Sequence, residues 1–191
     1  MAMRAWVKVF FIMILLPMLI GGVVLLIAGR PLAFEVLQRR TASKFPEVKW
    51  ITTADLDRWR ADSGQAQPVV LDARTGPEFE LSHLKGAKPI DPYQPSLKVL
   101  EGLPRDTALL VYSSAGYRGA RVASWLGKAG YSKALNLSGG LFQWANEGRP
   151  LFRQENRPTA MVHPYDRKWG LLLEKRYRAL APDLEAQSAA P

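Results

Sequence analysis

The sequence predicts an α/β fold: a single domain with a mainly parallel sheet flanked by helices, preceded by one transmembrane helix. Three observations lead to this prediction. Short apolar runs alternate with helical patterns between residues 48 and 147, as in a chain that passes repeatedly from strand to helix. The run at residues 68–71 is continuously apolar, which is typical of a strand buried on both faces of a parallel sheet. Residues 9–29 are the third feature, because none of these 21 residues is charged.

Five strands and five helices are expected in the domain. The strands are short, largely apolar stretches bounded by polar or turn-forming residues. In chain order they lie at residues 48–51, 68–72, 87–90, 109–112 and 134–137. The helices between them are expected at residues 53–61, 77–81, 97–103, 119–128 and 140–147.

Local signals support two of these helices in particular. Thr53 is expected to cap the helix at 53–61, which then buries Leu56 and Trp59. The helix at 119–128 has an apolar side made of Val122, Trp125 and Leu126. It follows the strand at 109–112 after a tight loop, so strand, loop and helix form one unit.

The loop after the strand at 109–112 is predicted to bind an anion. Successive backbone N–H groups over a helix N-terminus form a cradle that the helix dipole makes favourable for negative charge, and the guanidinium of Arg118 adds to it. The expected anion-binding residues are Ser113, Ser114, Ala115, Gly116, Tyr117, Arg118 and Gly119. Ligands of parallel sheets bind at the carboxyl ends of strands, where Ser113 falls.

At these residues the chain resembles the rhodanese-like sulfurtransferases, whose active-site loop is a cysteine, four residues and an arginine. Ser113 and Arg118 have this spacing, whereas the related phosphatase loop has one residue more. The resemblance covers about residues 49 to 151, in family order. Its further segments are Leu71-Asp72-Ala73-Arg74 with Glu78, Ser82-His83-Leu84-Lys85-Gly86-Ala87, and Leu137-Ser138-Gly139-Gly140 with Trp144. The resemblance implies that Asp72 and Arg74 brace the active-site loop.

A serine stands where the family has its reactive cysteine. A rhodanese carries sulfur as a cysteine persulfide, and the thiol, of pKa about 8.5, is activated by a helix N-terminus and nearby cations. These 191 residues contain no cysteine, and the hydroxyl of Ser113 cannot form a persulfide. Composition therefore excludes the ordinary sulfur-transfer mechanism. Ala115 and Gly119 also replace family hydroxyl residues, so the cradle loses side-chain donors and keeps its backbone.

Nucleophilic catalysis by Ser113 would need a positioned base. The two histidines are His83, which we interpret as a packing and hydrogen-bonding residue, and His163, which lies beyond the domain. The G-x-S-x-G pattern of serine hydrolases is absent around Ser113. No catalytic residue, metal site or cofactor is therefore predicted.

The apolar N-terminal stretch is predicted to be a single-pass anchor in the cell membrane. Its 21 uncharged residues match the roughly 20 that a helix needs to cross a bilayer. The alternative is a cleaved signal peptide, but the apolar region is longer than usual and lacks a clear cleavage site. The predicted organisation is an anchor at 1–29, a juxtamembrane linker at 30–48, the rhodanese-like domain at 49–151 and a C-terminal extension at 152–191.

The flanking charges disagree on which side of the membrane the domain lies. Arg4 and Lys8 favour a cytoplasmic tail with an exported domain, whereas five basic residues after the anchor favour the reverse. Because a short tail before a first hydrophobic segment commonly behaves as a signal-anchor, we expect an extracytoplasmic domain.

The C-terminal extension is basic. Residues 149–180 hold eight Lys and Arg against three Asp and Glu, within a chain of net charge +9. Residues 165–180 have apolar side chains at helical spacing, which predicts a basic amphipathic helix packed on the domain or lying on the membrane. Anionic lipid is the expected counter-surface, and no nucleic-acid partner is expected because no recognised binding motif accompanies the charge. Residues 181–191 are expected to be disordered.

Two functions remain open from the sequence. The first is a membrane-anchored, catalytically inactive module that binds a small oxyanion (sulfate, thiosulfate or phosphate) or a protein partner, as an adaptor. The second is a thiol-independent enzyme, such as a phosphoester or sulfoester hydrolase, that uses the same cradle.

Overall fold

The computed structural model describes residues 13, 16–154 and 157–180, and the chain divides into two compact units, residues 1–36 and 37–191. Helix α2 (Leu16–Lys44) begins in the first unit and contains Pro31. Among the described residues, no helix is both long enough and apolar enough to cross a membrane. Positions 9–12 and 14–15 of the predicted transmembrane segment lie outside the described residues, so that segment stays a prediction.

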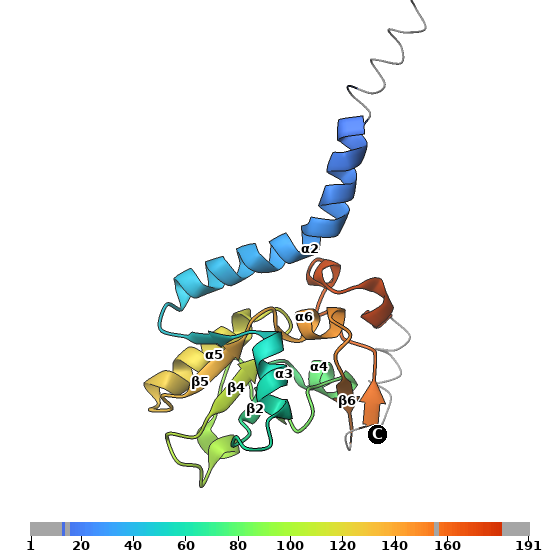
Figure 1. Ribbon diagram of the computed structural model, residues 1–191. Helices are drawn as coiled ribbons and strands as arrows, with labels where there is room; N and C mark the ends of the chain where they lie inside the picture. The colour runs from blue at the N-terminus through green and yellow to red at the C-terminus, as the bar shows by residue number, and fades with distance from the viewer. Residues whose placement is uncertain (1–12, 14–15, 155–156, 181–191) are drawn as a thin grey trace, which may run out of the picture. The chain divides into compact units, whose positions relative to one another are not determined.

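The second unit is built on a five-stranded parallel sheet (Figure 1). The strands are β1 (Lys49–Ile51), β2 (Val69–Asp72), β3 (Lys88–Pro89), β4 (Leu109–Tyr112) and β5 (Ala134–Leu137). Their spatial order is β1-β5-β4-β2-β3, and every neighbouring pair is parallel. All five lie where the sequence predicted strands. The central strand β4 is buried at each of its four residues, which explains its unbroken apolar run.

Helices flank the sheet, as predicted (Figure 1). They are α3 (Thr53–Ala61), α4 (Gly76–Leu81), α5 (Tyr117–Lys128) and α6 (Gly140–Asn146), with a single 3₁₀ turn, η2 (Leu97–Leu100), where a longer helix was predicted. Helix α5 starts two residues earlier than expected. The N-cap of α3 is Thr52 and not Thr53: the Thr52 side chain accepts from the Asp55 N–H at 3.1 Å. Thr53 is buried and donates to Glu147.

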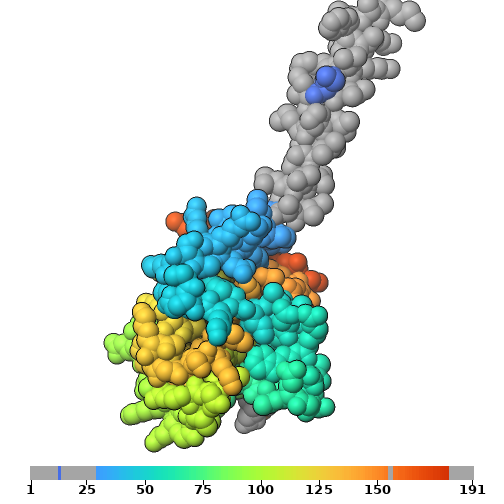
Figure 2. All heavy atoms as spheres, turned by 60° about the vertical axis from the view of Figure 1, so that its left-hand side comes forward, coloured from blue at the N-terminus to red at the C-terminus, as the bar shows by residue number. Residues whose placement is uncertain are grey.

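Residues 41–48, within the predicted juxtamembrane linker, pack on helix α5. Lys44 donates to the Tyr117 hydroxyl at 2.5 Å, and the Phe45 ring meets the Tyr117 ring edge to face at 5.7 Å. Glu47 accepts a hydrogen bond from Ser124. Figure 2 shows this side of the domain, with α5 (yellow) below the end of α2 and the start of β1 (blue to cyan). The approach to the first strand is therefore part of the folded domain.

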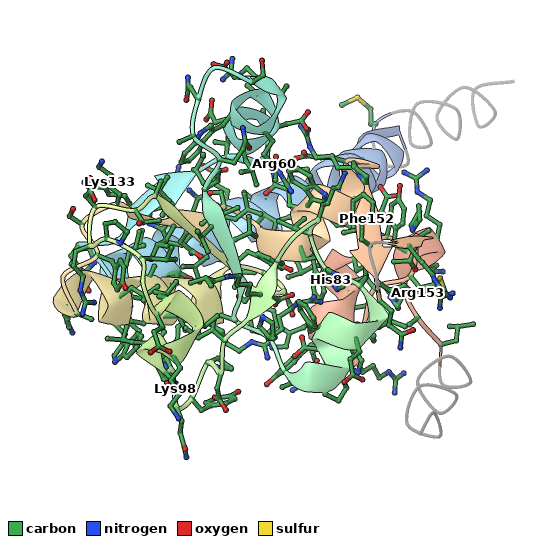
Figure 3. The ribbon with its side chains drawn as sticks, turned by 90° about the horizontal axis from the view of Figure 1, so that it is seen from below. Arg60, His83, Lys98, Lys133, Phe152 and Arg153 are labelled. Carbon is green, nitrogen blue, oxygen red and sulfur yellow. The ribbon has the colours of Figure 1, made fainter. Side chains whose placement is uncertain are left out.

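The C-terminal extension differs from its prediction. Strands β6 (Leu151–Arg153) and β7 (Arg157–Thr159) form an antiparallel hairpin that the sequence did not suggest. His83 and Phe152 join this hairpin to the domain by an isolated bridge (Figure 3).

The prediction of one amphipathic helix at 165–180 is wrong. This stretch forms two 3₁₀ turns, η3 (Trp169–Leu172) and η4 (Lys175–Tyr177). Between them the chain is extended at Leu173, whose side chain is fully buried. After η4, Arg178 forms an isolated parallel bridge with Val162. Burial of Leu173 and Val162 against the domain outweighs the helical spacing of the apolar residues.

Helix α6 starts against the loop that follows β4. Gly139 and Gly140 have φ of 67° and 57°, and the next two N–H groups donate to loop carbonyls: Leu141 to Ser113 and Phe142 to Ser114, each at 2.9 Å. A Cβ on Gly140 would lie 2.1 Å from the Ser113 carbonyl oxygen. Only glycine permits this approach, which explains the Gly-Gly pair in the sequence.

We therefore expect Gly140→Ala to lower the free energy of unfolding by roughly 2 kcal/mol or more, from left-handed backbone strain plus overlap with rigid backbone. Gly127→Ala is the matched control: Gly127 lies in α5 with open space around it, so alanine should be neutral or stabilising by up to about 1 kcal/mol. Urea unfolding of both variants measures the difference. Equal stabilities for the two variants would contradict the proposed role of Gly140.

Candidate functional site

The loop between β4 and α5 carries the predicted site. Ser113 and Ser114 are buried, at 2% and 6% exposure, and Arg118 is half-buried on the first turn of α5. Gly116 is the N-cap of α5, and its φ of 99° turns the backbone into the helix. The loop thus brings all seven predicted anion-binding residues to the carboxyl end of the central strand.

The backbone of this loop keeps unused donors. The Gly116 N–H donates to the hydroxyl oxygen of Ser113 at 3.2 Å. Within the described residues, five further N–H groups of the loop and first helical turn have no hydrogen-bond partner. They belong to Ser114, Ala115, Tyr117, Arg118 and Gly119. A set of free donors at a helix N-terminus favours negative charge.

The guanidinium of Arg118 is held by a buried carboxylate. It donates to both oxygens of Glu78, at 2.8 and 2.7 Å, and to the Ser114 hydroxyl at 2.9 Å. Ser114 in turn donates to Glu78 at 2.8 Å. The Glu78 side chain is only 1% exposed. The charge that the sequence assigned to the cradle is therefore compensated within the protein.

Glu78 sits at the start of helix α4 and also accepts from the Thr75 N–H at 3.0 Å. Burial alone would raise the pKa of its carboxyl, but the contacts with Arg118, reinforced by Arg74 and Thr75, lower this pKa from 4.5 to about 2. Glu78 is thus an anion over the whole physiological range. The sequence carried a partial signal for it, since Thr75 and Glu78 have the spacing of a capping box.

Asp72 and Arg74 lie together behind the loop, fully buried. Their side chains form a salt bridge at 2.7 Å. Asp72 accepts from the Tyr112 hydroxyl at 2.5 Å, and Arg74 donates to the Ser82 carbonyl. Tyr112 is the residue immediately before the loop, so the pair reaches the loop through Tyr112 and does not touch the cradle itself.

Gly119 is explained by close packing of α5 on the sheet. A Cβ there would lie 2.3 Å from Oδ1 of Asn136 and 3.1 Å from the Tyr112 carbonyl carbon. The Asn136 amide also donates to the Gly116 carbonyl at 2.9 Å. Asn136 therefore occupies the space that a hydroxyl side chain at position 119 would need.

Neither histidine supplies a base for Ser113. The His83 ring stacks on Phe79 with centroids 4.2 Å apart, and its Nδ1 contacts the Phe79 carbonyl, which confirms a packing role. His163 Nδ1 accepts from the Tyr165 N–H at 2.9 Å, and burial lowers the pKa of His163. No hydrogen bond joins either ring to Ser113 in the described part of the chain. The described residues also contain no cluster of metal-binding side chains.

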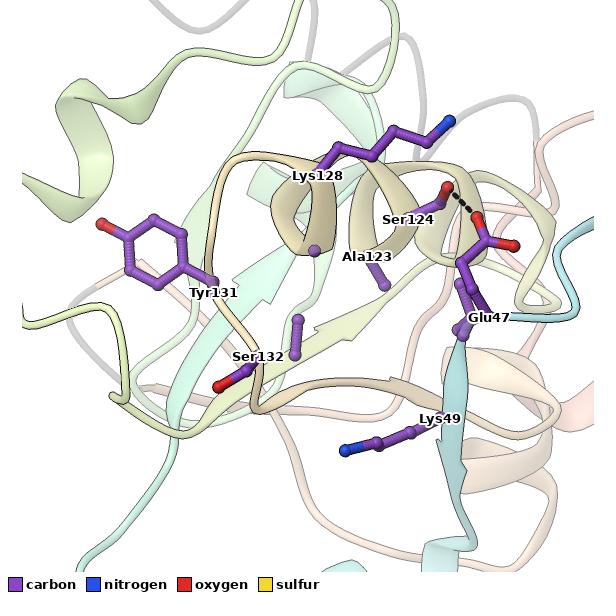
Figure 4. Close-up of a pocket in the computed structure, with 10 residues that line it drawn as sticks. Glu47, Lys49, Ala123, Ser124, Lys128, Tyr131 and Ser132 are labelled. Carbon is purple, nitrogen blue, oxygen red and sulfur yellow. Dashed lines mark hydrogen bonds between the residues drawn. The ribbon is translucent and has the colours of Figure 1, made fainter.

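A cavity of about 190 Å³ lies over the loop. Besides loop residues, its lining includes Tyr93, Arg121, Tyr165 and Trp169, none of which the sequence assigned to the site. The loop motif gave Tyr93 and Arg121 no role in the site, and Tyr165 and Trp169 fell within the helix predicted at 165–180. Another cavity, of about 350 Å³, lies between α5 and β1 and includes Glu47 and Ser124 (Figure 4). It contains no predicted site residue.

The pairing of Glu78 with Arg118 predicts a stability effect. Arg118→Met leaves a buried carboxylate without its partner, and we expect a loss of about 3–5 kcal/mol in the free energy of unfolding at pH 7. Adding Glu78→Gln to Arg118→Met should restore part of this loss. Urea unfolding of both variants gives the values, and a loss below about 1 kcal/mol for Arg118→Met would contradict the pairing.

The same pair predicts a pH dependence. Because the pKa of Glu78 is lowered to about 2, its contribution is fully present above pH 4.5 and is lost as pH falls towards 2. The shift of this pKa from 4.5 to about 2 contributes about 3 kcal/mol to the free energy of unfolding at neutral pH. Without Arg118, burial raises the pKa of Glu78, so the deficit of Arg118→Met should shrink as pH falls from 7 to 4. A deficit that stays constant over this range would contradict the assignment.

Known proteins resemble this chain over the residues that form the sheet and its helices. The family model of the rhodanese-like domain matches residues 52–147. Thiosulfate sulfurtransferase 18 of Arabidopsis thaliana is 32% identical over 103 residues, which cover 47% of this chain and 76% of that protein. A sulfurtransferase of Allochromatium vinosum is 28% identical over 108 residues, covering 56% of this chain and 98% of that protein.

Two further similarities concern a longer protein and a solved structure. The probable adenylyltransferase/sulfurtransferase MoeZ of Mycobacterium tuberculosis is 34% identical over 105 residues, and the chain covers 52% of its own length but only 25% of MoeZ. The crystal structure of the BH2092 protein of Bacillus halodurans superposes with a TM-score of 0.50 at 17% identity, covering 62% of this chain and 85% of that one. The latter is a likeness of fold. From the family model and the Arabidopsis relative together, the chain belongs to the rhodanese-like domain family, with Ser113 at the position of the family's reactive cysteine.

Proposed function

We propose that this chain is a rhodanese-like binding module that does not transfer sulfur. The observation that carries the proposal is Ser113 at the nucleophile position, in a sequence of 191 residues without a single cysteine. A persulfide needs a thiolate, and no residue here can form one. What remains of the site is a recognition surface.

The loop supports recognition of an oxyanion, or of an anionic group on a protein partner. Its free N–H groups belong to the loop and to the first turn of α5, and the hydroxyl of Ser113 lies in the same loop. Backbone donors do not depend on the residue that replaces the cysteine. The module would then act as an adaptor that holds a ligand without changing it.

A hydrolase is the second candidate. It would use Ser113 or a water molecule against a phosphoester or sulfoester held in the same cradle. Such chemistry needs a base, and the nearby carboxylate of Glu78, with a pKa of about 2 and bonds to Arg118 and Ser114, is a poor one. The binding function is therefore preferred.

We further propose that residues 9–29 anchor the module in the cell membrane as a single span. The support is their length and their lack of charge. The basic extension after residue 149 would favour anionic lipid. We place the domain on the extracytoplasmic side.

The first test is sulfur transfer. The purified chain should show no thiosulfate-to-cyanide transfer above the buffer rate. Ser113→Cys should create a thiol of lowered pKa, because the loop N–H groups and the helix dipole stabilise a thiolate, and some transfer should appear. Ser63→Cys, on an exposed turn, is the matched control and should have an ordinary thiol pKa and no transfer. Transfer by the unaltered chain that Ser113→Ala abolishes would overturn the proposal.

The second test concerns the anchor. The chain should sediment with membranes, resist high salt and alkaline carbonate, and keep its N-terminus, because salt screens basic contacts with lipid but does not extract a spanning helix. Protease protection in sealed vesicles then decides the side of the domain. Recovery of a form that begins near Arg30 or Pro31 would identify a cleaved signal peptide instead.

A further inference from the structure

The cavity over the loop has aromatic walls that the rhodanese-like segment alone does not provide. Tyr165 and Trp169 come from the C-terminal extension, beyond the matched residues 52–147, and face the cavity with Tyr93 and Tyr117. Its volume of about 190 Å³ is small. A cavity of about 150 Å³ in another protein holds benzene, so this one has room for a single ring with a compact substituent.

The extension is held in place over the loop. Tyr165 is the only non-glycine residue among those described with a positive φ, at 66°. Its N–H donates to His163, and Asp166 accepts from the N–H groups of Lys168 and Trp169 at 2.7 and 2.8 Å. A bulky residue in the left-handed region persists only where its surroundings impose it, and such strain is common where side chains clamp a ligand.

The charge of the cavity comes from Arg121. Arg118 is compensated by Glu78, and the Tyr165 ring covers its guanidinium at 4.7 Å. Arg121 lies one turn further along α5, under the Tyr93 ring at 5.1 Å. Within the described residues, no carboxylate lies at salt-bridge distance from Arg121. Hydrogen bonds from the Gln94 and Tyr93 N–H groups, and the charge of Arg121, lower the pKa of Asp91, but Asp91 does not line the cavity. Arg121 therefore contributes to the cavity wall a guanidinium that forms no salt bridge within the described residues.

Polar groups at the floor point to a ligand with acceptor oxygens. Ser113 lines the cavity and is 2% exposed. Its oxygen accepts from Gly116, but its hydrogen has no acceptor in the described structure. Ser114 and Ala115, whose N–H groups have no partner in the described structure, also line the cavity. A buried hydrogen-bond donor without an acceptor is unfavourable unless a ligand or a water molecule accepts its hydrogen bond.

We propose that this cavity binds a small aryl oxyanion, such as an arenesulfonate, an aryl sulfate or an aryl phosphate. The anionic group is held by the loop N–H groups, the Ser113 hydroxyl and Arg121. The ring lies among the aromatic side chains, with Trp169 and Tyr165 as its outer wall. The inference rests on the proposed binding function and adds the class of ligand and the residues that select it.

The test measures binding of benzenesulfonate, sulfate and phenol to the full chain in a non-ionic detergent, by calorimetry and by NMR shifts of the amides of residues 114–119. Benzenesulfonate should bind at least about tenfold more tightly than sulfate or phenol, because only benzenesulfonate uses both the charge and the ring wall. Phenol corrects for partition of the ring into detergent.

Two variants separate the two contributions. Arg121→Gln should weaken sulfate and benzenesulfonate alike, by about tenfold, through loss of a charge-assisted contact. Arg105→Gln is its matched control, because Arg105 also stacks on a tyrosine, Tyr131 at 4.6 Å, but outside this cavity. Trp169→Ala should lower the affinity for benzenesulfonate to that for sulfate, without changing the affinity for sulfate. Trp169→Phe should keep part of the preference for benzenesulfonate over sulfate. Thermal melts identify variants that do not fold.

The outcomes are distinct from those of the sulfur-transfer test. Equal affinities for sulfate and benzenesulfonate in the unaltered chain, or normal benzenesulfonate binding by folded Arg121→Gln, would overturn this inference and leave the binding module standing. Sulfur transfer by the unaltered chain would overturn the binding module itself, whatever the ligand preference.

Discussion

The buried carboxylate of Glu78 determines both the form and the charge of the loop after β4. It receives two hydrogen bonds from Arg118 and one from Ser114, and it starts helix α4 through the Thr75 N–H. A buried ion pair of this kind is strongly unfavourable to break, because the remaining charge would have no partner. The ion pair thus links the loop to helix α4, 40 residues earlier in the chain. It also neutralises the positive charge of Arg118 that the loop would otherwise present to a ligand.

Other elements hold the same loop from behind and from the side. The Asp72–Arg74 pair fixes Tyr112 at the end of β4, because Asp72 accepts a hydrogen bond from the Tyr112 hydroxyl. At the N-terminus of α6, two backbone N–H groups donate to the carbonyls of Ser113 and Ser114. None of these contacts involves the side-chain atom that differs between serine and cysteine. These contacts therefore hold the loop in the same way whether residue 113 is serine or cysteine.

The C-terminal extension changes the surroundings of this loop. Its chain does not form the separate helix that apolar spacing suggested, since Leu173 and Val162 are buried against the domain. This packing carries Tyr165 and Trp169 over the cradle, where they turn a polar floor into a cavity with aromatic walls. The cavity is therefore lined partly by residues outside the matched family segment.

The sequence by itself determined the strands, most of the helices, the family and the absence of any thiol that could form a persulfide. Alternation of apolar runs, the spacing of Ser113 and Arg118, and the absence of cysteine are properties of the chain order and composition, so no coordinates are needed to see them. The same local signals placed all seven cradle residues together. They failed for residues 165–180, where burial of Leu173 outweighed helical spacing.

Only the tertiary structure decided which charges are free. The loop motif assigns the anion to Arg118, but in the fold Arg118 forms a salt bridge with Glu78, whereas Arg121 forms none among the described residues. Long-range pairs such as Glu78 with Arg118, or Arg118 with the Tyr165 ring, have no trace in local periodicity. They arise because the sheet brings distant segments to one edge, and there the electrostatics of a site depend on distances in space and not on positions along the chain.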